Sequence, residues 1–374
     1  MKLRMSPDIH NNMSRLHFRI VAVLWATLAA ANGPAPHYGE TATGLEVPVT
    51  IVQTDSHHPG TLLAGTATAQ LFRSRDRAEN WTPLPFPMAF RSTLHTILID
   101  PAAPDTYLVG LSSEAPENAG VFRTTDGGAT WQQLRGLERK QVWALALWAG
   151  DPRVIAAGTP EGVFRTLDGG DNWTDLGSPN SARPHPVVSL AFDPKDRNTL
   201  YAGTPHLAWK TSDGGANWRR LSRGMQEDSD IFSIDVDPAR RSRLFAGACG
   251  GLYSSIDGGG TWSTLERAIG GPLRTYTVAR APGLHGVVFA GTSGGLLRSS
   301  DGGATWQKVS AEPARSIAFG PDDPRHIFVA TDHGVILSQD AGIHFRGPGA
   351  GADISKLSDP VAPTGRDQPA AARP

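Results

Sequence analysis

The chain has 374 residues, enough for one large all-β domain or two smaller ones, so length alone does not decide the domain count. Its 42 glycines and 29 prolines exceed what a helical protein of this size needs and favour many short strands joined by turns. The formal net charge of -1 excludes a net field that would attract nucleic acid or an anionic membrane surface, and the single cysteine, Cys249, excludes an intrachain disulfide.

The N-terminal segment has the pattern of a secretory signal. Basic Arg15 and Arg19 precede an apolar run over residues 20–31, which ends in small residues and is too short to span a bilayer comfortably. We therefore predict a cleaved signal peptide over residues 1–33 and a secreted or periplasmic mature protein with no stable membrane span. A retained anchor is the alternative. The start codon stays open between Met1 and Met13.

A repeated motif occupies the chain that follows. The motif reads Ser/Thr-x-Asp-x-Gly-x-Thr/Asn-Trp, as in Thr124 to Trp131, and occurs seven times. Two copies depart from it, because the first has Ala78 in place of glycine and the last ends in Phe345. The motif aspartates lie 39 to 50 residues apart, the length of one four-stranded propeller blade. They are Asp76, Asp126, Asp168, Asp213, Asp257, Asp301 and Asp340.

Four strand-like runs recur around each motif. The first typically ends at an Asp-Pro pair such as Asp193-Pro194, the second contains Ala-Gly-Thr, the third resembles Gly-Val-Phe-Arg, and the fourth begins at the motif tryptophan. A carboxylate before a tight turn can accept backbone N–H groups that the hairpin leaves unpaired, and glycine supplies the positive φ. We therefore predict structural aspartates in an all-β fold, a seven-bladed β-propeller of four-stranded antiparallel blades over residues 34–346.

These motifs resemble the Asp-box (BNR) repeats of a β-propeller superfamily that includes bacterial sialidases, xyloglucanases, sortilin-type receptor domains and photosystem II assembly-factor propellers. The resemblance covers about residues 47–346. One motif in each of seven blades is closer to the sortilin-type and assembly-factor members than to sialidases, which have six blades and fewer motifs. The resemblance implies a binding or assembly scaffold, and the arginine-rich face of the assembly-factor propellers is the implied contact surface.

Antiparallel strands divide the loops of such a propeller between two faces. The motif hairpins share the "box face" with the loops between first and second strands. The "mouth face" carries the blade-to-blade connections and the loops between second and third strands, surrounds the channel mouth and is the default binding site. Every blade-to-blade connection carries at least one basic residue, which predicts a surface that binds carboxylate, sulfate or phosphate groups. The alternative is that these basic residues are ordinary solvated loop residues. They are Arg91, Arg139 with Lys140, Arg183, Arg223, Arg267 with Arg274, and Arg315, and His185 is included among the predicted ligand-binding residues.

When the blades are aligned on their predicted first strands, one position near the start of the strand changes residue type from blade to blade. We call the residues at this position a column. It contains His95, Trp143, Val188, Phe232, Tyr276 and Arg315. We predict that this column shapes a ligand surface, and blade packing is the alternative for its aromatic members. Asp235 stands where other blades have alanine, so we expect its carboxylate to be hydrogen-bonded or to have a shifted pKa, in a structural role.

Two functions stay open. The favoured one is a monomeric, non-catalytic scaffold without cofactors that binds a protein or glycan partner with anionic groups and no nucleic acid. The alternative is a glycoside hydrolase of sialidase-like or xyloglucanase-like type. Tyr276 with Arg274 and Arg315 fits a sialidase, but residues 90–93 only half match the sialidase Phe-Arg-Ile-Pro signature, and a xyloglucanase cleft normally lies between two propellers. No catalytic residue is assigned and no metal site is predicted, since His57-His58 and Asp332-His333 lack zinc-ligand spacing.

The C-terminal segment, residues 347–374, is rich in proline, alanine and glycine, and we predict a disordered tail. The seventh motif is weak, so the sequence leaves the closure of the ring open. One further strand within residues 36–46 is predicted to complete the last blade.

Overall fold

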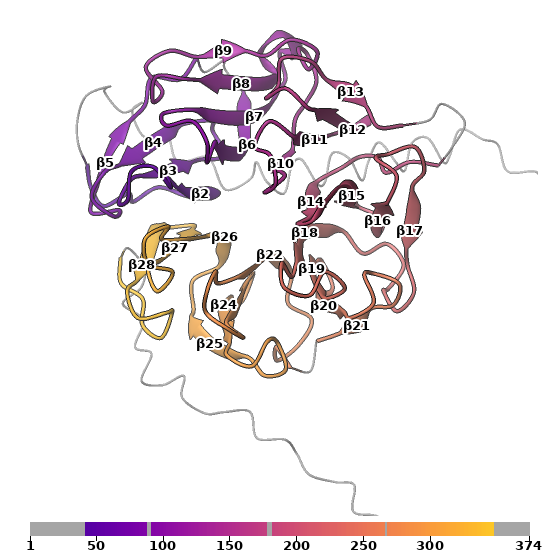
Figure 1. The fold of residues 1–374 in the computed structure, drawn as a ribbon. Coiled ribbons are helices and arrows are strands. Elements are labelled where there is room, and N and C mark those ends of the chain that lie inside the picture. The colour runs from indigo at the N-terminus through magenta and orange to yellow at the C-terminus, as the bar shows by residue number, and fades with distance from the viewer. Residues whose placement is uncertain (1–41, 88–90, 178–181, 266–267, 348–374) are drawn as a thin grey trace, which may run out of the picture.

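The computed structural model describes residues 42–87, 91–177, 182–265 and 268–347, which form seven antiparallel sheets around a central axis (Figure 1). This confirms the predicted all-β, seven-bladed propeller. The second to seventh blades each pair their strands in chain order, and the first strands of neighbouring blades contact one another around the axis. The predicted signal peptide and the tail after Gly347 lie outside the described residues.

The first three blades contain thirteen strands and one short 3-10 helix. The first blade has β1 (Ala42–Thr43), β2 (Ile51–Thr54), β3 (Leu62–Gly65), β4 (Leu71–Ser74) and β5 (Asn80–Pro83). The second has β6 (Ser92–Ile99), β7 (Tyr107–Ser113), β8 (Gly120–Thr124) and β9 (Gln132–Gln133), with η1 (Pro116–Asn118) between β7 and β8. The third has β10 (Ala144–Leu147), β11 (Ile155–Thr159), β12 (Gly162–Thr166) and β13 (Thr174–Asp175).

The other four blades follow the same order. The fourth has β14 (Ser189–Asp193), β15 (Asp196–Gly203), β16 (Ala208–Thr211) and β17 (Arg219–Leu221). The fifth has β18 (Ile231–Val236), β19 (Leu244–Ala248), β20 (Gly251–Ser255) and β21 (Ser263–Thr264). The sixth has β22 (Thr275–Arg280), β23 (Val288–Thr292), β24 (Gly295–Ser299) and β25 (Gln307–Ser310), and the seventh has β26 (Ala314–Phe319), β27 (Ile327–Thr331) and β28 (Gly334–Ser338).

The motif turn is closed by its own side chains. In the second blade the Thr124 hydroxyl accepts the N–H of Gly128 (2.9 Å) and donates to Asp126 (2.7 Å), whose carboxylate accepts the N–H of Thr130 (2.9 Å). Gly127 and Gly128 have φ values of +68° and +91°, a region that glycine enters without steric cost. The same hydroxyl, carboxylate and amide contacts recur in the other six motifs.

The hydrophobic core lies between the blades. Seven buried clusters occur, and each combines apolar side chains from two adjacent blades. The blades approach closely where the second strand carries glycine: a Cβ on Gly203 would lie closer than 3.0 Å to the carbonyl oxygen of Ile231 in the next blade. The backbone N–H of Ile231 donates to the carbonyl of Thr204 at 3.0 Å. The recurrent Ala-Gly-Thr sequence therefore sets the blade spacing.

The ring closes with the same type of contact. The N–H of Val49 in the first blade donates to the carbonyl of Thr331 in the seventh (2.9 Å), and the Thr54 hydroxyl donates to the carbonyl of Phe319 (2.7 Å). The prediction that a strand within residues 36–46 completes the last blade is wrong for its described part. β1 instead pairs with β5 as the outermost strand of the first blade, and in the seventh blade only a bridge between Leu337 and Arg346 follows β28 among the described residues.

Basic side chains also link neighbouring blades. Third-strand residues Arg73, Arg123, Lys210 and Arg298 each donate to a carbonyl in the motif turn of the following blade, over 2.8 to 3.3 Å. The fifth blade has Ser254 at this position, and Arg243 beside β19 donates to Gly302 instead (2.5 Å). These contacts orient each turn against its neighbour on the box face.

Candidate functional site

The column predicted at the channel entrance lies where the chain enters each innermost strand. In four blades a register shift leaves this residue out of the strand pairing: His95 in β6, Phe232 in β18, Tyr276 in β22 and Arg315 in β26. A bulge of this kind bends the strand and changes the direction of the side chain. All four residues are partly exposed, so the bulges make them available at the mouth face.

Residues from the fifth, sixth and seventh blades meet there in a stack, which we call the cation–aromatic ladder: Arg274, Phe232, Tyr276 and Arg315. The Arg274 guanidinium lies 5.5 Å from the ring centroid of Phe232, and that of Arg315 lies 4.2 Å from the ring of Tyr276. The Phe232 and Tyr276 rings are 6.3 Å apart. Asp332 holds Arg315 from the side, with Nε and Nη2 at 3.1 and 3.2 Å from its two oxygens.

His95 and Trp143 form a second contact across the column, with ring centroids 6.4 Å apart. The Nε2 atom of His95 lies 2.7 Å from the Ser112 hydroxyl. Although His95 is partly exposed, the surrounding protein desolvates its ring and lowers its pKa to about 4, because a charged imidazole is poorly solvated there. His95 is therefore neutral at pH 7 and adds no positive charge to the mouth face.

A hollow of about 590 Å³ opens on the mouth face between the third and fourth blades, and we call it the blade 3/4 hollow. Arg183 and His185 of the connection line it together with His206, Trp209 and Arg220 of the fourth blade. Arg183 Nη1 lies 2.9 Å from Asp175, and His206 Nδ1 lies 3.0 Å from Asp228. The Arg220 guanidinium stacks 5.1 Å from the Trp209 ring.

The other predicted basic residues do not join these two groups. Arg91 pairs with Glu114 at 2.7 Å, and both side chains are exposed at the edge of a smaller hollow beside η1. Arg139 and Arg223 are exposed and lie outside the ladder and the blade 3/4 hollow as the structure describes them. Arg267 lies outside the described residues.

Some residues of both groups were missed by sequence reasoning. Asp332 and His206 belong to loops between second and third strands, which the strand order already assigned to the mouth face. Reading those loops residue by residue would have found them. Trp209 and Arg220 lie within strands, and their place in a hollow depends on packing between blades.

Asp235 is ion-paired within the wall of the ring. Its carboxylate lies 2.5 Å from Nε of Arg280 in the next blade, and Arg280 also lies 3.4 Å from Asp237. Burial raises the pKa of Asp235, and the Arg280 charge offsets part of that rise. The contact joins the fifth and sixth blades.

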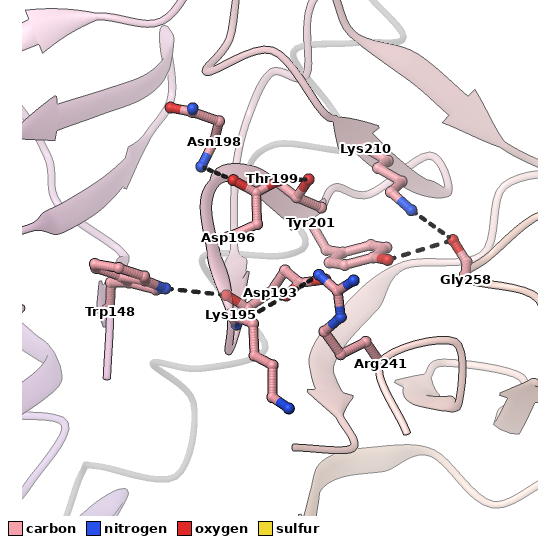
Figure 2. Close-up of polar contacts among 10 residues, drawn as sticks. All are labelled: Trp148, Asp193, Lys195, Asp196, Asn198, Thr199, Tyr201, Lys210, Arg241 and Gly258. Carbon is pink, nitrogen blue, oxygen red and sulfur yellow. Dashed lines mark hydrogen bonds and ion pairs between the residues drawn. The ribbon is translucent and has the colours of Figure 1, made fainter. Parts of the chain in front are cut away.

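The box face shows polar side chains engaged with backbone. Figure 2 shows Asp193, at the end of β14, between the third and fifth blades. Its carbonyl accepts Trp148 Nε1 (3.1 Å), and its carboxylate accepts the Lys195 N–H (2.9 Å) and pairs with Arg241 (3.1 Å). The hydroxyl of Tyr201 donates to the carbonyl of Gly258 (3.4 Å), and burial raises the pKa of Tyr201 to about 12. This cluster connects three blades.

The carboxylates of the motif aspartates accept hydrogen bonds within the turn, and these hydrogen bonds lower their pKa values. Hydrogen bonds from the Thr130 hydroxyl and N–H, and from Thr124, lower the pKa of Asp126 to about 2. Contacts of the same kind lower the pKa of Asp168, Asp213, Asp301 and Asp340 to about 2. The carboxylates are therefore ionised while they hold the turns.

The described residues contain no group of three or more histidine, cysteine, aspartate or glutamate side chains arranged to hold a metal ion. None of the helical segments among them is long and apolar enough to cross a membrane.

Several solved structures resemble this fold. A GH74 xyloglucanase from Xanthomonas campestris gives a TM-score of 0.65 at 19% identity, over 82% of this chain and 54% of that chain. YCF48 bound to D1 peptide gives 0.60 at 19% identity, over 82% of this chain and 98% of that chain. The extracellular domain of BT4673 from B. thetaiotaomicron gives 0.62 at 17% identity, over 80% of this chain and 40% of that chain.

The chain thus spans about half the length of the xyloglucanase and matches nearly all of YCF48. At these identities the likeness shows the seven-bladed propeller fold alone. No protein-family model and no curated protein sequence matches the chain.

Proposed function

We propose that this chain is an exported, monomeric, non-catalytic scaffold of the Asp-box type that binds a protein partner at its mouth face. The cation–aromatic ladder carries the proposal. Guanidinium groups stacked on aromatic rings retain in-plane donors for carboxylate or other oxyanion groups, and the rings add apolar contact area. YCF48, a propeller of similar length, has been solved with a bound peptide, which supports a protein partner.

The carboxylates beside the ladder favour binding over glycoside hydrolysis. Asp332 is held by Arg315, and Glu312 is held by His333 at 2.6 Å. A glycosidase needs one carboxyl group kept protonated as the acid and a second free to act as nucleophile or base. Both carboxylates are engaged by neighbouring side chains, which leaves neither free for the nucleophile or base role.

The experiment is a peptide and glycan binding array on the mature protein, run beside fluorogenic glycoside substrates. Replacing Arg274 or Arg315 with alanine removes one stacked cation, and we expect about a tenfold loss of partner binding. Arg240→Ala is the matched control, because Arg240 is exposed and lies on the box face, in the loop between β18 and β19. Binding that survives both ladder variants, or glycoside turnover that is lost in Glu312→Gln, would contradict the proposal.

A further inference from the structure

The blade 3/4 hollow is lined by an arginine, Arg220, that is not part of the cation–aromatic ladder. Trp209 is 5% exposed and forms its wall, and the exposed Arg220 stacks on that ring. Arg183 stands on the connection side of the hollow, paired with Asp175. A stacked guanidinium is held in one plane, so it loses little freedom when it accepts a ligand.

The basic side chains around the hollow differ in whether a carboxylate pairs with them. Arg183 and His206 each have a carboxylate partner, at 2.9 and 3.0 Å. In the part of the chain that the structure describes, no carboxylate pairs with Arg220. Glu161 also lines the hollow and is the one acidic residue among its lining side chains. Arg220 therefore offers the open positive charge, and Glu161 opposes it.

The dimensions of the hollow limit what enters it. A volume of about 590 Å³ admits a few residues of extended chain or one small organic group and is too small for a folded domain. A carboxylate on a short aliphatic stem matches this site, because the stem can pack on the apolar Pro160 of the lining while the two oxygens meet the planar donors of Arg220, which Trp209 holds in place.

We propose that the blade 3/4 hollow receives an acidic side chain, glutamate or aspartate, from an extended segment of the protein partner. Arg220 binds its carboxylate, Pro160 contacts its stem, and Glu161 weakens binding by like-charge repulsion. This inference rests on the proposed function, since it places a protein partner on the mouth face.

The test uses fluorescein-labelled hexaglutamate, with labelled hexaglutamine as the uncharged probe, and measures fluorescence anisotropy at low salt. Arg220→Ala is expected to weaken hexaglutamate binding about tenfold and Arg220→Lys severalfold, because lysine lacks the planar donor pair. Glu161→Gln is expected to strengthen it. Arg240→Ala is the matched control, an exposed arginine in the loop between β18 and β19 on the box face and outside the hollow, and its binding is expected to stay within twofold of the parent. Circular dichroism verifies that each variant is folded.

The outcomes separate the two proposals. Equal hexaglutamate affinity in the parent and Arg220→Ala, or an equal loss in Arg240→Ala, overturns the assignment of the hollow. If the parent protein does not bind hexaglutamate but binds an array partner through Arg315, the assignment of the hollow is overturned and the proposed scaffold function is retained. Array binding that is insensitive to both Arg315→Ala and Arg220→Ala overturns the scaffold function as well.

Discussion

Replacing Gly203 with alanine tests whether glycine in the second strand sets the spacing of the blades. The added Cβ would lie closer than 3.0 Å to the Ile231 carbonyl oxygen and to the Ser189 hydroxyl, so the fifth blade must move outward. Overpacking of this kind costs about 1–3 kcal/mol. The movement also strains the 3.0 Å bond from Ile231 N–H to Thr204, which contributes about 1 kcal/mol.

We therefore expect Gly203→Ala to lower the free energy of unfolding by about 2–4 kcal/mol. At about 2–4 °C per kcal/mol, the thermal midpoint falls by roughly 4–16 °C, measured by near-UV circular dichroism during heating, and the loss of stability is measured independently by urea unfolding. Ala330→Gly is the matched control, because Ala330 occupies the same position in the seventh blade and precedes Thr331, which closes the ring. It removes a methyl group instead of adding one and is expected to cost about 1 kcal/mol or less. An unchanged unfolding midpoint for Gly203→Ala would refute the role of glycine in blade spacing.

Three other predictions concern the motif turns and the ring wall. The folded-state pKa of Asp126, Asp168 and three other motif aspartates lies at about 2, below the unfolded value of about 3.9, so their stabilisation is present above pH 4 and is lost as pH falls towards 2. Urea midpoints that stay constant between pH 5 and pH 2.5 would count against this. Ala78 adopts a φ of +72° in the degraded first motif, so Ala78→Gly is expected to raise the free energy of unfolding by up to about 1 kcal/mol, and an unchanged urea midpoint would contradict this. Asp235→Ala removes one partner of the partly buried Arg280 pair and is expected to cost about 1–3 kcal/mol, whereas a thermal midpoint equal to that of the parent would show that Asp237 alone satisfies Arg280.

The repeat made most of the fold predictable because its determinants are local. Asp126 and Gly127 fix a turn within eight residues, and seven such turns at blade spacing leave few other architectures. The pairing of β1 was not predictable in the same way. A two-residue strand carries no pattern of its own, and its position is specified by its pairing partners in β5, Trp81 and Asn80. The same limit applied to Arg220, whose place in the hollow depends on a neighbouring blade that the sequence alone does not position.

The residue type in the column at the channel entrance can vary because the bulged residues take no part in strand pairing. Ile231 and Ser233, on either side of Phe232, pair with β19, and Ile231 is also buried between blades, so their size and direction are constrained. Phe232 itself has no partner in that register and lies partly exposed. The same holds for Tyr276 and Arg315, where the flanking residues keep the pairing. Substitution in this column therefore changes the mouth face at little cost to the ring, which lets one repeated framework present different mouth-face surfaces.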